Sequence, residues 1–253
     1  MTVETPNIPN IPNIPNIPGT PDTPIPDDSV VGRLKHACAT DWSAYTGHAF
    51  VRALAAGTLP EASFRHYLIQ DYLFLIHFAR AYALAAYKSD DLDEMREATG
   101  AVDALLNTEM KLHVAYCARW GISEAALRAT PEARATLAYT RYVLATGGAG
   151  DLLDLLVALA PCACGYGEIG ARVLADPATR LEGNPYRAWI ELYSGADFQD
   201  VSRNAVAQLD RIAARQLGPD PTASGRWPAL CRTFAEATRL EADFWQMGLD
   251  LRD

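Results

Sequence analysis

Apolar residues recur every three or four positions along most of this chain, which is the period of one face of an α-helix. The pattern is clearest between Pro60 and Lys88. A helix there would carry on one face Phe64, Leu68, Tyr72, Leu75, Ala79 and Tyr82. A proline followed by an acid suits the first turn of a helix, so Pro60-Glu61 is predicted to be its start.

The same pattern predicts further helices that are separated by glycine and proline. Ser29 can cap the first of them. The other predicted helical segments are residues 41–59 (in one or two short pieces), 91–120, 123–129, 131–148, 151–174, 184–193, 197–217 and 226–249. No segment shows the convincing alternation of apolar and polar residues that a half-buried strand would have. Residues 29–253 are therefore predicted to form a single all-α domain.

Residues 1–28 differ in composition from the rest of the chain. Four Pro-Asn-Ile triplets follow one another from Pro6 to Ile17, and half of the chain's 16 prolines precede Asp28. A proline at nearly every third position and few groups to bury favour a polyproline-II-like or disordered segment. We therefore predict a disordered, proline-rich N-terminal tail. A passive tail explains this composition better than a docking segment does.

Length and charge narrow the classes of function. The 253 residues can bury a sizeable core, and the formal net charge of −9 disfavours nucleic acid and anionic membranes as partners. No stretch reaches the about 20 uninterrupted apolar residues of a membrane span, and the N-terminus lacks the pattern of a secretory signal. The five cysteines are scattered apart from one Cys-x-Cys pair. Reduced thiols and a cytoplasmic location are therefore expected.

Candidate chemistry is concentrated in residues 151–174, where a long apolar run contains a proline and a thiol. In a helix, Cys162 and Tyr166 would lie one turn apart on the same face. Asp71 lies within the apolar run LIQDYLFLIHF, where burial of a carboxylate is costly without a partner. Glu241 lies one turn before the aromatic pair Phe244-Trp245.

Each of these residues taken alone is more often structural, as a surface acid, a core hydroxyl or a buried thiol. Taken together with Tyr139 and Tyr193, which also lie on helices with an apolar face, they suit a pocket for a flat, polar aromatic ligand. The aromatic rings would stack on such a ligand, and the carboxylates would hold its amino groups or protonated ring nitrogens.

Two other motifs in the sequence are weaker. Residues 165–170 fit the dinucleotide pattern G-x-G-x-x-G, but the preceding segment is rich in leucine and alanine and contains Pro161, which does not suit a central strand. Glycines that let two helices approach closely explain the pattern better, and we reject nucleotide binding there. Cys162-x-Cys164 lacks the second pair that a zinc site needs. Glu109 and His113 are spaced to share a metal, but without a second such pair they are better explained as solvated surface residues.

Five segments resemble the TenA/thiaminase II family over about residues 30–250. They are His48-x-Phe50-Val51-Arg52-Ala53-Leu54 with Gly57-Thr58-Leu59, Phe64-x6-Asp71-Tyr72, Leu159-x-Pro161-Cys162-x3-Tyr166-x-Glu168-x-Gly170, Tyr186-x2-Trp189-Ile190-x2-Tyr193 and Glu241-x2-Phe244-Trp245-x-Met247. This family often has proline after the histidine that aligns with His48, where this chain has Ala49. The resemblance implies an all-α, haem-oxygenase-like helical bundle, in which Cys162 assigns the chain to the thiol-bearing branch of the family.

The resemblance also implies an activity. The reaction is hydrolysis of 4-amino-5-aminomethyl-2-methylpyrimidine to the hydroxymethyl pyrimidine and ammonia, which salvages degraded thiamine, with thiamine hydrolysis as a secondary activity. Cys162 would be the nucleophile and Glu241 the acid/base partner. The substrate-binding residues would be Asp71, Phe74, Tyr139, Tyr166, Tyr193 and Phe244. No cofactor or metal is expected, the partner is the small-molecule aminopyrimidine or thiamine, and the family usually forms homotetramers.

The residues support this chemistry, because a thiolate can add to the ring once a carboxylic acid has protonated a ring nitrogen, and the exocyclic group then departs. We therefore expect Cys162 either to have a lowered pKa or to be deprotonated by a nearby base, and burial to raise the pKa of Glu241 or Asp71. Two alternatives remain open. One is a di-iron or cofactor-less oxidase on the same fold, and the other is a non-catalytic pyrimidine-binding or regulatory protein.

Overall fold

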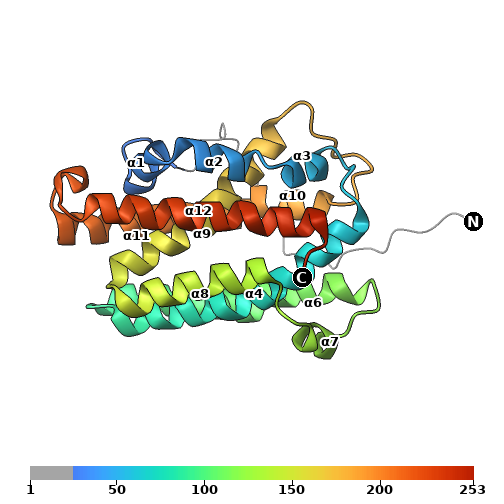
Figure 1. Ribbon diagram of the computed structural model, residues 1–253, viewed down its shortest axis with the longest axis horizontal. Helices are drawn as coiled ribbons and strands as arrows, with labels where there is room; N and C mark the ends of the chain where they lie inside the picture. The colour runs from blue at the N-terminus through green and yellow to red at the C-terminus, as the bar shows by residue number, and fades with distance from the viewer. Residues whose placement is uncertain (1–24) are drawn as a thin grey trace, which may run out of the picture.

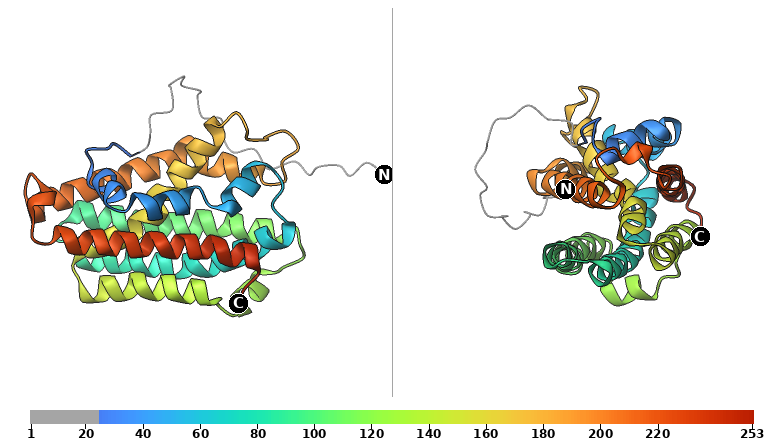
Figure 2. Two further views of the ribbon diagram at one scale, coloured as in Figure 1. Left: turned by 45° about the horizontal axis from the view of Figure 1, so that its top comes forward. Right: turned by 90° about the vertical axis from the view of Figure 1, so that its left-hand side faces the viewer.

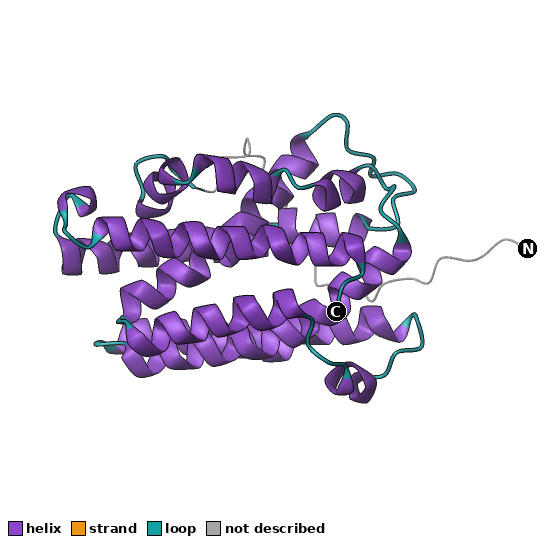
Figure 3. Ribbon diagram, in the orientation of Figure 1, coloured by secondary structure: helices purple, strands orange, loops and turns teal. Residues whose placement is uncertain are grey.

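The computed structural model describes residues 25–253, which form helices and connecting loops without a strand (Figure 3). The Pro-Asn-Ile triplets of the predicted tail lie outside the described residues. Ile25 is already buried in the core, at 3% exposure, so packed structure begins before Ser29. The predicted all-α class agrees with this architecture.

Twelve α-helices in the described range follow the predicted order. Their bounds are α1 Val30–Ala37, α2 Ala39–Thr46, α3 Ala49–Ala55, α4 Glu61–Lys88, α5 Leu92–Ala104, α6 Met110–Ala118, α7 Glu124–Ala129, α8 Arg134–Ala149, α9 Leu152–Ala175, α10 Arg187–Ser194, α11 Ala196–Leu217 and α12 Trp227–Asp250. A π-helical turn, η1 (Leu105–Glu109), joins α5 to α6, and a short 3₁₀ turn, η2 (Pro221–Ala223), precedes α12.

Local signals in the sequence explain most helix ends. The Ser29 side chain accepts a hydrogen bond from the Gly32 N–H, as expected for an N-cap, and Asp151 forms a reciprocal capping box with Asp154. Three predictions need correction. The helix expected over 91–120 is interrupted by η1, and α8 begins at Arg134 rather than at Pro131, because Ala133 is extended and acts as the N-cap. The helix expected over 184–193 begins at Arg187, where Tyr186 is the N-cap.

Helix α9 lies at the centre of the molecule and contacts α2, α4, α8, α10, α11 and α12. Figures 1 and 2 show it crossing obliquely behind α12, whereas α4, α8 and α12 run side by side along the long axis. By length and apolar composition α9 could cross a membrane, but 83% of its most apolar window is buried inside the protein. Its apolar character is therefore that of a core helix, and it places Pro161, Cys162 and Tyr166 in the interior.

The three glycines of the rejected dinucleotide pattern allow close packing around α9, as predicted. A Cβ atom built on Gly165 would lie 2.4 Å from the Tyr45 ring, and one on Gly167 would lie 2.8 Å from Ser202. A Cβ on Gly170 would lie 2.4 Å from the backbone of Tyr193. Since residues 165–170 lie inside one helix, the strand-turn-helix context of a nucleotide site does not occur there.

Substitution of Gly170 should therefore be costly. We expect Gly170→Ala to lower the free energy of unfolding by about 1–3 kcal/mol, because the backbone of α10 cannot yield to the new methyl group without shifting. The matched control is Gly148→Ala in α8, where a Cβ meets no atom within 4 Å. Alanine favours helix there, so this variant should gain about 0.4–1 kcal/mol. Urea unfolding of both variants checks the contrast, and equal effects would contradict it.

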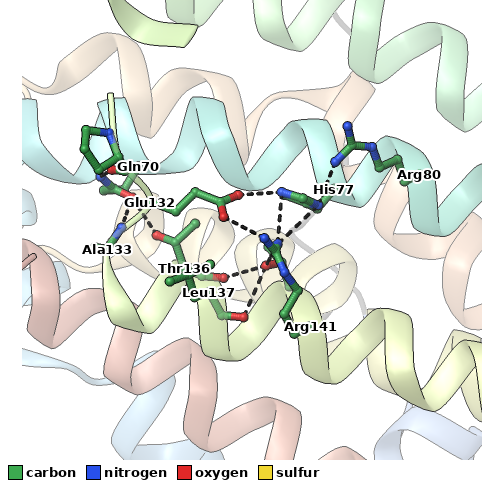
Figure 4. A network of polar contacts seen from close by, with 10 residues as sticks. Gln70, His77, Arg80, Glu132, Ala133, Thr136, Leu137 and Arg141 are labelled. Carbon is green, nitrogen blue, oxygen red and sulfur yellow. Dashed lines mark hydrogen bonds and ion pairs between the residues drawn. The ribbon is translucent and has the colours of Figure 1, made fainter. Parts of the chain in front are cut away.

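Polar contacts fix the register of α4 against the start of α8 (Figure 4). The Gln70 amide donates to the Pro131 carbonyl and accepts from the Ala133 N–H and the Thr136 hydroxyl, at 2.8–3.0 Å. Further along, His77 and Arg141 both bind Glu132. These contacts matter for the interior because Gln70 directly precedes Asp71, while Thr136 and Arg141 bracket Tyr139.

Candidate active site

A thiol, a carboxyl and a phenol meet where α8, α9 and α12 pack together. Glu241 of α12 is 2% exposed, and its Oε1 accepts a hydrogen bond of 2.9 Å from the Tyr139 hydroxyl of α8. The partly buried Cys162 thiol of α9 lies near the same carboxyl, whose charge acts on it. Three helices thus bring together a candidate nucleophile, a candidate base and the group that orients this base.

The surroundings of Glu241 favour its neutral form. Burial raises its pKa to about 8, and the negative charge of Asp71 adds to this rise, while the hydrogen bond from Tyr139 acts in the opposite direction. The predicted upward shift is confirmed for Glu241. A carboxyl with such a pKa is a much stronger base, once ionised, than an exposed glutamate.

The prediction of a lowered pKa for Cys162 is wrong. Burial raises the pKa of this thiol well above its usual value, and the charges of Glu241 and Asp71 raise it further. The described surroundings provide acids and phenols next to Cys162 rather than a cation or a helix N-terminus. Proton transfer to a neighbouring base, the second possibility that we considered, is therefore the route that this geometry supports.

Asp71 forms the second part of the site, on α4. Its Oδ2 atom accepts hydrogen bonds from the His113 Nε2, at 2.7 Å, and from the Tyr67 hydroxyl, at 3.3 Å. The other ring nitrogen of His113, Nδ1, lies 2.9 Å from the Glu109 carbonyl. Because the carbonyl only accepts, Nδ1 carries a proton. With Asp71 as a carboxylate, which also only accepts, Nε2 carries a proton as well, and His113 is then an imidazolium ion that pairs with Asp71.

The pKa of His113 agrees with this assignment. Burial lowers it, but the hydrogen bond and charge of Asp71, together with the charge of Glu109, outweigh that effect and raise it above the usual value. The interpretation of Glu109 and His113 as solvated surface residues is thus wrong. His113 is only 3% exposed, and the carboxyl of the partly buried Glu109 accepts a hydrogen bond from Tyr193. Both belong to the site because α6, which carries His113, and η1, which carries Glu109, pack against α4.

Aromatic rings pack together near the two acidic groups. The Phe74 ring lies 5.0 Å from that of Tyr139 and 5.7 Å from that of Phe244, and the Tyr166 and Tyr193 rings are 4.9 Å apart. The Tyr166 hydroxyl lies 3.4 Å from that of Tyr67 and thereby connects to Asp71. All eight residues that the sequence singled out, from Asp71 to Phe244, thus gather around one interior region.

Sequence reasoning did not assign four members to this region, namely Tyr67, Glu109, His113 and Trp189. Tyr67 acts as a hub, because it donates toward Asp71 and accepts a hydrogen bond of 3.3 Å from the Trp189 indole. Tyr67 lies four residues before Asp71, and this spacing could have predicted that the two side chains share one face of the helix. The spacing of His113 was noticed only as that of a metal ligand. Among residues 25–253, no three His, Cys, Asp or Glu side chains are grouped so that they could hold a metal ion.

Comparison with known proteins relates this site to a described family. Residues 36–251 match the TENA/THI-4/PQQC family. The chain belongs to this family. It is 42% identical over 210 residues to an uncharacterized protein of Haemophilus influenzae, covering 83% of this chain and 94% of that protein. It is 37% identical over 212 residues to the aminopyrimidine aminohydrolase of Halalkalibacterium halodurans, covering 83% and 91% of the two chains.

Solved structures agree with the family assignment. A TenA family transcription regulator from Silicibacter sp. TM1040 superposes with a TM-score of 0.83 at 52% identity, covering 87% of this chain and 96% of that one. A Shewanella denitrificans domain with a heme oxygenase-like fold has a TM-score of 0.66 at 15% identity, covering 87% and 92%. The predicted haem-oxygenase-like helical bundle is confirmed.

In this TENA/THI-4/PQQC member, loss of either partner of the buried Asp71–His113 pair should lower the stability of the fold. We expect His113→Leu to lower the free energy of unfolding by about 3–5 kcal/mol, because it leaves the Asp71 carboxylate buried without its cation. The double variant Asp71→Asn/His113→Leu should recover part of this loss, since a neutral amide is cheaper to bury. Chemical unfolding at pH 7 measures both, and a double variant no more stable than His113→Leu would contradict the assignment.

Proposed function

We propose that this protein hydrolyses 4-amino-5-aminomethyl-2-methylpyrimidine to 4-amino-5-hydroxymethyl-2-methylpyrimidine and ammonia, with Cys162 as the nucleophile. The observation that carries the proposal is the Cys162 thiol against the high-pKa carboxyl of Glu241, within an aromatic-lined interior that also contains Asp71. Relatives named aminopyrimidine aminohydrolase, at 36–37% identity in two bacteria, support the same activity.

Substrate binding follows from the polar groups that remain free. Both hydrogen bonds to Asp71 from within residues 25–253 go to its Oδ2, so its Oδ1 can accept from the amino group of the pyrimidine. The rings of Phe74, Phe244 and Tyr166 provide surfaces on which the flat ring can stack. This arrangement would direct the aminomethyl group toward Cys162 and Glu241.

The proton balance of the reaction requires one base that works in both directions. Ionised Glu241 takes the proton of the Cys162 thiol, and the thiolate adds to the electron-poor ring. Glu241 then gives the proton to the aminomethyl nitrogen, the C–N bond breaks and ammonia leaves. Water adds to the resulting exocyclic methylene and gives a proton to Glu241. Finally the C–S bond breaks, the ring regains aromaticity, and the thiolate recovers its proton.

The two raised pKa values suit this shuttle. A thiol whose pKa is raised by burial is difficult to deprotonate, and Glu241, with a pKa of about 8, is the strongest carboxylate base available beside it. Tyr139 holds the carboxyl in place and so fixes the direction of transfer. Proton transfer by a positioned group contributes about 10²–10⁴-fold to such reactions.

The main alternative is an oxidase on the same fold, because the name of the matching family also includes PQQC. Substrate turnover under nitrogen and in the presence of a metal chelator separates the two functions. Hydrolysis uses only water and should proceed at an unchanged rate, whereas an oxidase would stop without oxygen. A third function is regulation, because the Silicibacter relative is named a transcription regulator. Tight pyrimidine binding without any turnover would support that function.

Three further features belong to the same proposal. Thiamine should be hydrolysed as a secondary substrate, because its pyrimidine half presents the same ring and exocyclic methylene to Cys162. The protein should act in the cytoplasm, where its five cysteines stay reduced. It should also assemble as a homotetramer, which light scattering coupled to size-exclusion chromatography would test through a mass of four chains of 27.5 kDa.

A further inference from the structure

Glu109 is a second acidic group of the site for which the reaction described above has no role. It is the last residue of the π-helical turn η1, and its carbonyl accepts from His113, so the backbone there is fixed by the same histidine that binds Asp71. Single π-helical turns occur frequently at functional sites, because they rotate the following side chains relative to a regular α-helix. Here the turn brings the Glu109 carboxyl to Tyr193 of α10.

In the hydrogen bond between Glu109 and Tyr193, either group can be the donor, depending on whether Glu109 is protonated. The Tyr193 hydroxyl lies 3.4 Å from the Glu109 Oε1, and Tyr193 is only 2% exposed. When Glu109 is ionised it can only accept, so the Tyr193 hydroxyl must donate to it. When Glu109 is protonated it can donate to the Tyr193 oxygen, and the hydroxyl proton of Tyr193 is then free to point into the site.

Two other hydroxyls near the site do not have this freedom. Tyr139 donates to Glu241, and Tyr67 donates toward Asp71. The Tyr193 hydroxyl has no hydrogen-bond partner other than Glu109 within the described part of the chain, and the Tyr193 ring lies 4.9 Å from that of Tyr166. A pyrimidine ring nitrogen only accepts hydrogen bonds, and it gains negative charge when a thiolate adds to the ring. A donor at that nitrogen therefore stabilises the adduct more than the free substrate.

We propose that Glu109 is a positioning residue that sets the direction of the Tyr193 hydroxyl, and that only protonated Glu109 leaves Tyr193 free to donate to a ring nitrogen of the pyrimidine. This inference rests on the proposed function of the site. The two acids therefore need opposite protonation states, because Glu241 must be ionised when the reaction starts whereas Glu109 must be protonated.

The surroundings of Glu109 allow this requirement to be met near neutral pH. Burial raises its pKa to about 7, the charge of His113 lowers it, that of Asp71 raises it, and the hydrogen bond from Tyr193 lowers it. Other titratable groups also interact with Glu109 electrostatically, from α4 and α9. They are Tyr67, Tyr82 and Cys162.

The pH dependence of kcat/KM with the aminomethyl pyrimidine tests the inference. The wild-type profile should be a narrow bell, because it needs Glu241 ionised, with a pKa of about 8, and Glu109 protonated, with a pKa of about 7. Glu109→Gln should convert the bell into a curve that rises through about pH 8 and stays high. The amide of glutamine donates to the Tyr193 oxygen at every pH and so imitates the protonated acid. The ratio of variant to wild-type kcat/KM should rise about 10²-fold from pH 6 to pH 9.

Two further variants keep the outcome decisive. Tyr193→Phe should lower kcat/KM and also remove the decline at high pH. This variant tests the inference even if Glu109→Gln does not fold. Glu191→Gln, which changes an exposed acid of α10 that pairs with Arg187, should leave the bell unchanged. A bell that persists in Glu109→Gln or in Tyr193→Phe would overturn the inference. An inactive wild type would instead contradict the proposed function, so the two failures are distinguishable.

Discussion

Replacement of Cys162 by alanine should lower kcat/KM for the aminomethyl pyrimidine by about 10³-fold or more, because it removes the group that forms the covalent adduct. The circular dichroism spectrum and the unfolding midpoint should stay close to those of the wild type, since the thiol is small and only partly buried. Cys162→Ser should be nearly as inactive, because the hydroxyl is a much weaker nucleophile at a position without a cation. Ammonia release measured over enzyme concentrations spanning four decades would resolve such losses.

Cys164→Ala is the matched control for this variant. Cys164 lies two residues away on α9, is fully buried, and its thiol lies beside Ser202 of α11 rather than beside Glu241. Its removal should leave turnover within about threefold of the wild type, with at most a modest loss of stability for a small cavity. If Cys164→Ala abolished activity and Cys162→Ala did not, the assignment of the nucleophile would be wrong.

The second large effect is expected for Glu241→Gln. This change keeps the size of the side chain and an oxygen that can accept from Tyr139, but it removes the base. We expect kcat to fall by about 10²–10⁴-fold, with little change in substrate binding. The acid-side limb of the kcat/KM profile should disappear with it, since that limb reports the ionisation of Glu241. Steady-state kinetics between pH 6 and pH 9.5 would measure both effects.

Stability measurements provide an independent readout of the same carboxyl. The folded pKa of Glu241, about 8, lies above the unfolded value of 4.5, so the folded state binds more protons between these two values. Its contribution to stability is therefore complete below about pH 4.5 and is lost as the pH rises toward 8. Glu241→Gln should flatten this decline, whereas Glu236→Gln, at a surface position of the same helix, should not. Equal slopes in all three proteins would mean that Glu241 has an ordinary pKa.

Much of the fold could be predicted because local signals and helical periodicity agree. Ser29, Pro60, Asp91 and Asp151 lie at the predicted helix starts, and apolar spacing identified the long helices α4, α9, α11 and α12. The π-helical turn η1 could not be predicted in this way. It inserts without a proline or glycine to mark it, and the apolar spacing on either side remains compatible with one continuous helix.

The site was predictable to the extent that carboxylates and a thiol stood out among apolar neighbours. Asp71, Cys162 and Glu241 do converge, but periodicity alone did not show that α6 brings His113 to Asp71. A histidine four residues after a glutamate has the same pattern on a surface helix as on a buried one. The pKa of Cys162 was also mispredicted, because it depends on which charges face the thiol from other helices, and these are Glu241 and Asp71 rather than a cation.

The measurement that tests the central claim most directly is the stoichiometry of product release by the wild-type protein. The aminomethyl pyrimidine and thiamine would be incubated separately with the enzyme at pH 7.5, and ammonia and the hydroxymethyl pyrimidine would be quantified over time. We predict that ammonia and hydroxymethyl pyrimidine appear in equal amounts from the aminomethyl compound, and that thiamine reacts more slowly. Folded, helical protein that releases neither product from either compound would contradict the account.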